Sequence, residues 1–99
     1  MVSIEQVRET IEPLVNQFGI AKVGIFGSYA RREASDCSDL DILITFNKEK
    51  EMDLIEFIHL QNIISDKLSI PIDLVEEEYL NKDFASDVLQ EVVYIYGER

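Results

Sequence analysis

The sequence has a single cysteine, Cys37, and no tryptophan. One thiol cannot form a disulfide within the chain or build a zinc site alone, so a disulfide-stapled secreted framework is excluded. No apolar run approaches the roughly 18 residues that a membrane-spanning helix needs. The first residues, M-V-S-I-E-Q-V-R, also lack the basic start and apolar stretch of a secretion signal. We therefore expect a soluble, cytoplasmic protein without a membrane association.

Basic residues are scarce. Nine Lys and Arg stand against 20 Asp and Glu, which gives a formal net charge of −11. A charge of this sign repels DNA and RNA, so nonspecific nucleic acid binding is not expected. A basic protein partner fits the charge better. The alternative is that the acidic residues simply keep the surface soluble, and the two explanations are compatible.

Length limits the architecture. With 99 residues, of which 46% are hydrophobic, the chain can bury one core but is too short for two domains. We expect one domain over residues 1–99. Any acceptor surface beyond a single small pocket must then come from a partner molecule.

Hydrophobic periodicity predicts alternating helices and strands. Ser3 and Gln6 form a capping box at the start of an amphipathic helix that ends at Gly19, and Pro13 should bend or split that helix. Further strands are expected at 21–26, 39–46 and 70–75, and further helices at 28–34, 53–67 and 83–91. The run 92–96 fits either state, although its β-branched and aromatic residues favour a short strand.

Particular side chains have expected structural roles in these elements. Ser28 should cap the short helix, and Asp83 should cap the last one. The inward positions of the helix 53–67 are expected to include Leu54, Phe57, Ile58 and Ile64. Four tyrosines are expected to be packing residues: Tyr29, Tyr79, Tyr94 and Tyr96.

Two features mark the connection between the first two strands. Gly27 and Ser28 follow the first strand, where a residue without Cβ lets backbone N–H groups approach an anion such as phosphate. Asp39 and Asp41 begin the second strand, and alternation places both on one face, where paired carboxylates attract a hard divalent cation. If the two strands are antiparallel, these residues meet at one end of the sheet. A parallel third strand would add Asp73 to the same end.

The pattern G-S, ten residues, then D-x-D resembles the signature of the polymerase β-like nucleotidyltransferase superfamily. G-S-Y-A-R at 27–31 and S-D-L-D at 38–41, in so short a chain, resemble the MNT group more closely. These minimal nucleotidyltransferases are typically encoded beside a HEPN-domain protein, as the antitoxin of a toxin–antitoxin pair. The resemblance covers essentially the whole chain. It implies an α/β (α+β) fold, in which helices pack against a small mixed sheet.

The resemblance also implies a catalytic site. Asp39 and Asp41 would bridge two Mg²⁺ ions, while Asp73 would bind the catalytic ion and could orient or deprotonate the nucleophile. Gly27 and Ser28 would hold the triphosphate of ATP. The structural alternatives are a turn cap for Asp39 and ordinary strand acids for Asp41 and Asp73.

Three further positions belong to the motif. Arg31 matches its Arg and could either neutralise phosphate charge or fix the acidic loop. Ser38, which precedes the first Asp, could contact phosphate or shape the turn. Arg32 departs from the small residue, usually Gly, that follows this Arg in many members of the group.

By resemblance, the function is Mg²⁺-dependent transfer of AMP from ATP to a tyrosine hydroxyl of a cognate HEPN toxin, which silences that toxin. The main alternative is a binding antitoxin that neutralises its partner by occlusion. Transfer to a small molecule is less favoured, because 99 residues leave little room for an acceptor domain. The base of the nucleotide and the oligomeric state stay open.

Overall fold

A four-stranded mixed sheet forms the centre of the computed structural model, which describes residues 2–35 and 38–97 and so leaves Cys37 outside. The strand order is β3-β2-β1-β4, with β1 (Ile20–Phe26), β2 (Leu40–Phe46), β3 (Ile72–Glu76) and β4 (Val93–Tyr96). β1 is antiparallel to β2 and β4, whereas β2 and β3 are parallel. The mixed sheet agrees with the predicted fold class, and β4 confirms the short strand favoured for the last apolar run.

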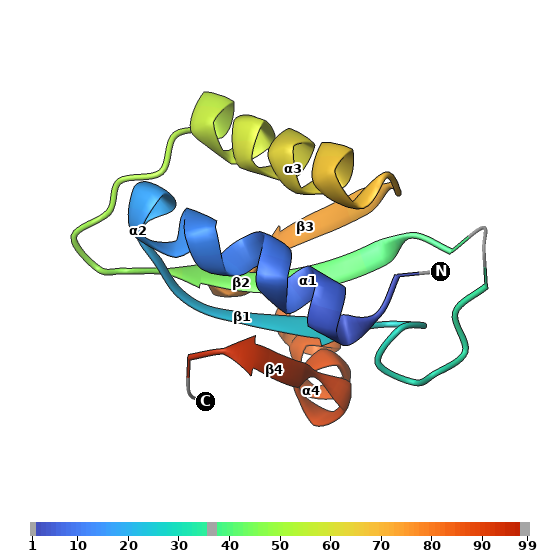
Figure 1. Ribbon diagram of the computed structural model, residues 1–99. Coiled ribbons are helices and arrows are strands. Elements are labelled where there is room, and N and C mark those ends of the chain that lie inside the picture. The colour runs from blue at the N-terminus through green and yellow to red at the C-terminus, as the bar shows by residue number, and fades with distance from the viewer. Residues whose placement is uncertain (1, 36–37, 98–99) are drawn as a thin grey trace.

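Helices cover both faces of this sheet (Figure 1). α1 (Ile4–Ile11), α2 (Val15–Phe18) and α3 (Leu54–Leu68) lie over one face, and α4 (Lys82–Glu91) lies against the other. The alternation of β2 follows this division: Leu40, Ile42 and Ile44 belong to the larger core, whereas Leu43 packs with Phe26 and Val88 in a smaller one. Asp41 has the parity of Leu43, so it lies on the α4 side of the sheet.

The N-terminal helix begins and divides as predicted. Ser3 Oγ accepts from the Gln6 amide at 3.1 Å, and the Ser3 amide donates to Gln6 Oε1 at 2.8 Å, which completes the capping box. Pro13 lies in a 3₁₀ turn, η1 (Glu12–Leu14), that separates α1 from α2. Gly19 then ends α2 in the left-handed region, at φ 65°.

Residues 27–32 form turns, so the helix predicted for 28–34 is wrong. The Arg31 amide donates to the Gly27 carbonyl at 3.1 Å and the Glu33 amide to the Ser28 carbonyl at 2.8 Å, which makes one wide turn. Arg32 has φ 60°. Because the left-handed conformation ends a helix, the chain cannot continue as a second helical turn.

The cap predicted for α4 is also wrong. Asn81 is the N-cap residue, and its Oδ1 accepts from the Asp83 amide at 2.8 Å. Asp83 lies inside the first turn, where its charge still complements the helix dipole. The second long helix, α3, is capped by Asp53, whose Oδ1 accepts from the Glu56 amide at 2.7 Å.

Two of the inward positions predicted for α3 face solvent instead. Leu54 and Ile58 are 71% and 47% exposed, whereas Leu60 and Ile64 are fully buried. α3 is apolar on several sides, so its sequence leaves the rotation of the helix about its axis poorly determined. Tyr79 is 78% exposed, so it is not the packing residue that was predicted.

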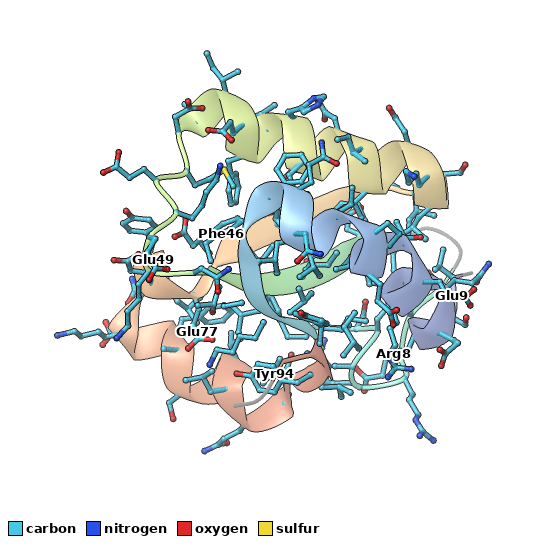
Figure 2. The ribbon with its side chains drawn as sticks, turned by 60° about the vertical axis from the view of Figure 1, so that its left-hand side comes forward. Arg8, Glu9, Phe46, Glu49, Glu77 and Tyr94 are labelled. Carbon is cyan, nitrogen blue, oxygen red and sulfur yellow. The ribbon has the colours of Figure 1, made fainter. Side chains whose placement is uncertain are left out.

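Two side-chain contacts join separate elements of the fold, and Figure 2 labels one residue of each, Phe46 and Arg8. Phe46, at the end of β2, packs edge-on against Phe57 of α3 with ring centroids 6.4 Å apart. Arg8 of α1, near the start of the chain, donates from Nε to the carbonyl oxygen of Ile95 in β4, near its end, at 3.2 Å. In the part of the chain that the structure describes, no helix is long and apolar enough to cross a membrane.

Candidate active site

The predicted site residues gather where β1 ends and where β2 and β3 begin. Asp41 is the register partner of Phe26 on β1 and of Asp73 on β3. Gly27 follows Phe26 directly and begins the turn of residues 27–32, called the glycine turn below. This turn therefore lies beside the acidic start of β2. The juxtaposition expected from an antiparallel and a parallel neighbour is therefore present.

A cavity of about 690 Å³ opens at this end of the sheet. Six predicted residues line it: Gly27, Ser28, Arg31, Ser38, Asp39 and Asp41. α4 supplies a further wall with Phe84, Asp87, Val88 and Glu91. Asp73 lies outside the lining that the described residues form, on the β3 side of Asp41. The glycine turn, the paired acids and α4 thus enclose one space.

Negative charge is crowded around Asp41. Burial raises the pKa of the Asp41 carboxyl above its usual value, and the charges of Asp73, Asp39 and Glu91 raise it further, while Arg31 opposes the shift. A negative charge nearby disfavours the ionised form of a carboxyl group, so these three neighbours oppose the ionisation of Asp41. A divalent cation would relieve this repulsion, so the electrostatics of the site suit a metal.

The three aspartates also fit Mg²⁺ by their chemistry, since this ion prefers oxygen ligands and retains part of its water shell. Asp39 and Asp73 are exposed, and Asp41 is half-buried. Among residues 2–35 and 38–97, no three carboxylate, imidazole or thiol groups are already arranged as metal ligands. The backbone therefore brings the donors together, and their side chains would have to turn toward a common ion.

Gly27 is needed for its conformation and for its lack of a side chain. Its φ is 74°, a value that residues with Cβ adopt at a cost. A Cβ at this position would fall on the carboxylate oxygen Oδ2 of Asp41, well inside van der Waals distance. The turn can therefore lie directly against Asp41 because residue 27 is glycine.

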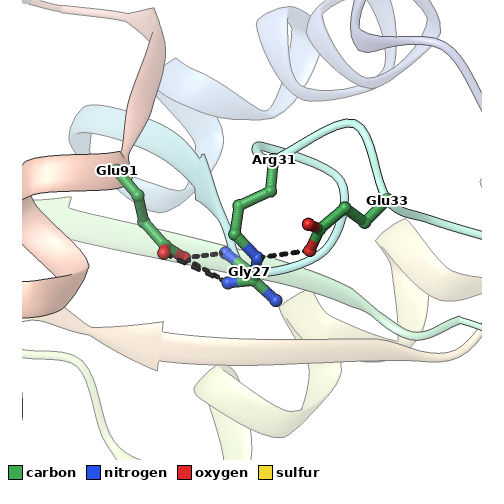
Figure 3. A network of polar contacts seen from close by, with 4 residues as sticks. All are labelled: Gly27, Arg31, Glu33 and Glu91. Atoms are coloured by element: carbon green, nitrogen blue, oxygen red, sulfur yellow. Dashed lines mark hydrogen bonds and ion pairs between the residues drawn. The ribbon is translucent and has the colours of Figure 1, made fainter.

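Arg31 and Gly27 share one partner, Glu91 (Figure 3). The Gly27 amide donates to Glu91 Oε2 at 2.5 Å, and Arg31 Nη1 lies 3.1 and 3.2 Å from the two Glu91 oxygens. On its other side, Arg31 Nε donates to Glu33 Oε1 at 2.8 Å. The hydrogen bonds to Glu33 and then to Glu91 raise the pKa of Arg31, so it stays charged. Arg31 thus fixes two acidic side chains, Glu33 and Glu91 of α4, and its role toward phosphate stays a prediction.

Sequence reasoning missed Glu91. It lies 64 residues after Gly27, outside any motif, at the end of α4. One signal was available: the last turn of α4 reads V-L-Q-E, with an acid where the helix dipole favours a base.

Ser38, in contrast, adopts one of its expected roles. Its Oγ accepts from the Ser35 amide at 2.9 Å, so it shapes the loop before β2.

Comparison with known proteins identifies the family. The profile of the family "Polymerase beta, Nucleotidyltransferase" matches residues 8–99. The chain belongs to this nucleotidyltransferase family. Among curated relatives, the protein adenylyltransferase MntA of Thermococcus cleftensis is 36% identical over 96% of this chain and 98% of its own length. The resemblance to the minimal nucleotidyltransferases is thus confirmed.

Solved structures share the nucleotidyltransferase fold. One that carries the provisional assignment of a minimal nucleotidyltransferase is 30% identical, with a TM-score of 0.76 over 93% of this chain and 95% of its own. Another is the complex of a tri-AMPylated Shewanella oneidensis HEPN toxin with an MNT antitoxin. It matches 95% of this chain and 72% of its own with a TM-score of 0.71. At 19% identity, that likeness concerns the fold.

Proposed function

We propose that this nucleotidyltransferase transfers AMP from ATP to a tyrosine hydroxyl of a cognate HEPN toxin, with Mg²⁺ as cofactor, and so acts as the antitoxin. The observation that supports this most is the meeting of the glycine turn, Arg31 and the paired acids Asp39 and Asp41 around one cavity. Such a cavity offers donors for a triphosphate beside carboxylates for a metal. The relatedness to MntA supports a protein as the acceptor.

In the proposed reaction the tyrosine oxygen attacks the α-phosphorus of ATP. A new phosphorus–oxygen bond forms to the tyrosine, the bond to the bridging oxygen breaks, and pyrophosphate leaves with the electron pair. When bound at Asp39, Asp41 and Asp73, Mg²⁺ would stabilise negative charge on the attacking and leaving oxygens. The hydroxyl proton passes to a carboxylate, for which Asp73 is the candidate because it is exposed beside Asp41.

The remaining residues bind and orient the triphosphate. The Gly27 amide and the Ser28 hydroxyl are donors at the end of β1, and Arg31 brings a guanidinium to the same side of the cavity. Ser38 holds the loop that carries Asp39 in place through its bond to Ser35. These groups fix the α-phosphate in line with an incoming hydroxyl, which is the main contribution a protein makes to such a transfer.

Occlusion remains the second candidate, because the surface also offers contacts that need no chemistry. Leu54, Ile55 and Tyr79 are 71%, 81% and 78% exposed. Leu54 and Tyr79 line an apolar groove of about 430 Å³, toward the far end of β3 from Asp73. Exposed apolar groups of this size suit a protein partner whether or not AMP is transferred.

The position of a radiolabel in ATP tests the proposed reaction. The protein is incubated with Mg²⁺ and the product of the adjacent gene, with ATP labelled at either the α- or the γ-phosphate. Label from the α-position should appear on the partner, and label from the γ-position should not. Transfer of the γ-label would indicate a kinase, and transfer of neither would favour occlusion.

A further inference from the structure

Glu91 occupies the place that an anionic ligand of the glycine turn would take. Its carboxylate accepts from the Gly27 amide at 2.5 Å and contacts Arg31 Nη1 with both oxygens, at 3.1 and 3.2 Å. A backbone amide after a strand and an adjacent guanidinium are the donors that a phosphate oxygen would use. Figure 3 shows the carboxylate facing both donors, with dashed lines to each of them.

We propose that Glu91 is an internal competitor of the nucleotide triphosphate and sets the affinity of the chain for ATP. The proposal rests on the function proposed above, since it names a further residue of the same site. Entry of the triphosphate displaces the Glu91 carboxylate from Gly27 and Arg31. Arg31 then contacts phosphate while its Nε keeps the bond to Glu33 Oε1.

Two unfavourable interactions make Glu91 displaceable. It is the last residue of α4, where the negative end of the helix dipole repels a carboxylate. It also lies close enough to Asp41 for its charge to disfavour ionisation there. The contacts to Gly27 and Arg31 offset both costs in the nucleotide-free chain. A triphosphate offers more negative charge to the same two donors, so it can replace the Glu91 carboxylate there.

Asp87 provides a matched control. It lies one helical turn before Glu91 on α4, it lines the same cavity, and it carries the same charge. The contacts of the Gly27 amide and Arg31 Nη1 described above are made by Glu91 and not by Asp87. Removing either charge reduces the general repulsion of ATP, but removing Glu91 also frees the two donors.

The experiment measures binding of an ATP analogue with an uncleavable α–β bridge, by calorimetry and without any partner protein. Glu91→Ala should lower the Kd by about tenfold or more, since a charge-assisted competitor is lost. Asp87→Asn should lower it by a smaller factor. Glu91→Gln, which keeps the shape and loses the charge, should lie between wild type and Glu91→Ala. Thermal unfolding of each variant verifies that it is folded.

A second measurement follows the Gly27 amide, which donates to Glu91 in the nucleotide-free chain. The amide resonance of Gly27 should shift on Glu91→Ala without nucleotide, and in the wild type it should shift when the analogue is added. If Glu91→Ala binds the analogue no more tightly than Asp87→Asn, or more weakly than wild type, Glu91 holds the turn in place and the competitor proposal is wrong. If no variant binds the analogue, the proposed nucleotidyl transfer fails as well, so the two failures are distinguishable.

Discussion

Asp41 on β2 lies directly opposite Asp73 on the parallel strand β3. Two carboxylates at matched positions of adjacent strands repel each other, and a third, Asp39, lies two residues before Asp41. The burial of Asp41 strengthens this repulsion, because nearby water is reduced. The arrangement therefore costs stability in the absence of a cation, and several measurable properties depend on it.

Replacement of Asp41 by Asn should stabilise the metal-free protein while abolishing transfer. The amide keeps the size of the side chain and removes one of the crowded charges, so the melting temperature in EDTA should rise by a few degrees. Mg²⁺ should raise the melting temperature of the wild type and not of Asp41→Asn. Transfer of AMP should fall by orders of magnitude in Asp41→Asn and in Asp39→Asn. Parental transfer rates in both variants would show that these acids hold no catalytic metal.

The same crowding predicts how stability depends on pH. The pKa of Asp41 is raised in the folded state, so the folded chain holds this proton more tightly than the unfolded chain. Without metal, the contribution of Asp41 to stability is therefore greatest below its ordinary pKa and declines as the pH rises through the folded pKa. The difference in unfolding free energy between Asp41→Asn and wild type should grow over this acidic range and then level off. A constant difference would exclude Asp41 as its source.

Replacement of Gly27 should block nucleotide binding by two routes. A side chain here meets Asp41 Oδ2 and must also adopt φ 74°, so Gly27→Val should push the turn away from the acids. The affinity for ATP should therefore fall below the measurable range. Ser28→Ala leaves the backbone unchanged and removes one hydroxyl, which should cost about 10²–10³ in rate if it stabilises charge in the transition state. Unchanged nucleotide affinity in Gly27→Val would contradict the phosphate role of the turn.

Two positions outside the catalytic groups should accept glycine with a gain in stability. Arg32 and Ser69 have φ 60° and 57°, in the left-handed region, and Ser69 ends α3. Because glycine adopts this conformation without steric cost, Arg32→Gly and Ser69→Gly should each stabilise the fold by about 1 kcal/mol. Chemical denaturation measures this gain. Ser69→Ala is the control, and it should not stabilise.

Much of the fold could be predicted because local signals agreed with the global arrangement. The capping box at Ser3, the break at Pro13 and the terminating Gly19 are each determined by the chemistry of one residue. The rotation of α3 could not be predicted. Apolar residues surround much of that helix, and the sheet, rather than periodicity, decides that Leu60 is buried and Leu54 exposed.

The candidate site was predictable where it depends on strand pairing and not where it depends on side-chain contacts across the fold. The alternation of side chains along each strand, together with the strand directions, was sufficient to predict that Gly27, Asp41 and Asp73 lie close together. Glu91 reaches Gly27 because α4 packs on the sheet face opposite α1, α2 and α3. No local sequence pattern determines that packing. The turn at Arg32 was missed for a related reason, since its left-handed φ contradicts the ordinary preference of arginine.

The last prediction separates an enzyme from an occluding antitoxin. If neutralisation is catalytic, one molecule of this chain with ATP and Mg²⁺ should inactivate many partner molecules, and inactivation should persist after the two proteins are separated. Occlusion requires equimolar protein and reverses on dissociation. Asp39 and Asp41 favour catalysis, because a pure binder would gain nothing from their mutual repulsion.

The assay mixes substoichiometric protein with the partner, with and without ATP, and locates AMP on its tyrosines by mass spectrometry. Asp41→Asn is the control, since it should still bind the partner and should fail to modify it. An unmodified partner that is silenced one to one without nucleotide would establish occlusion instead.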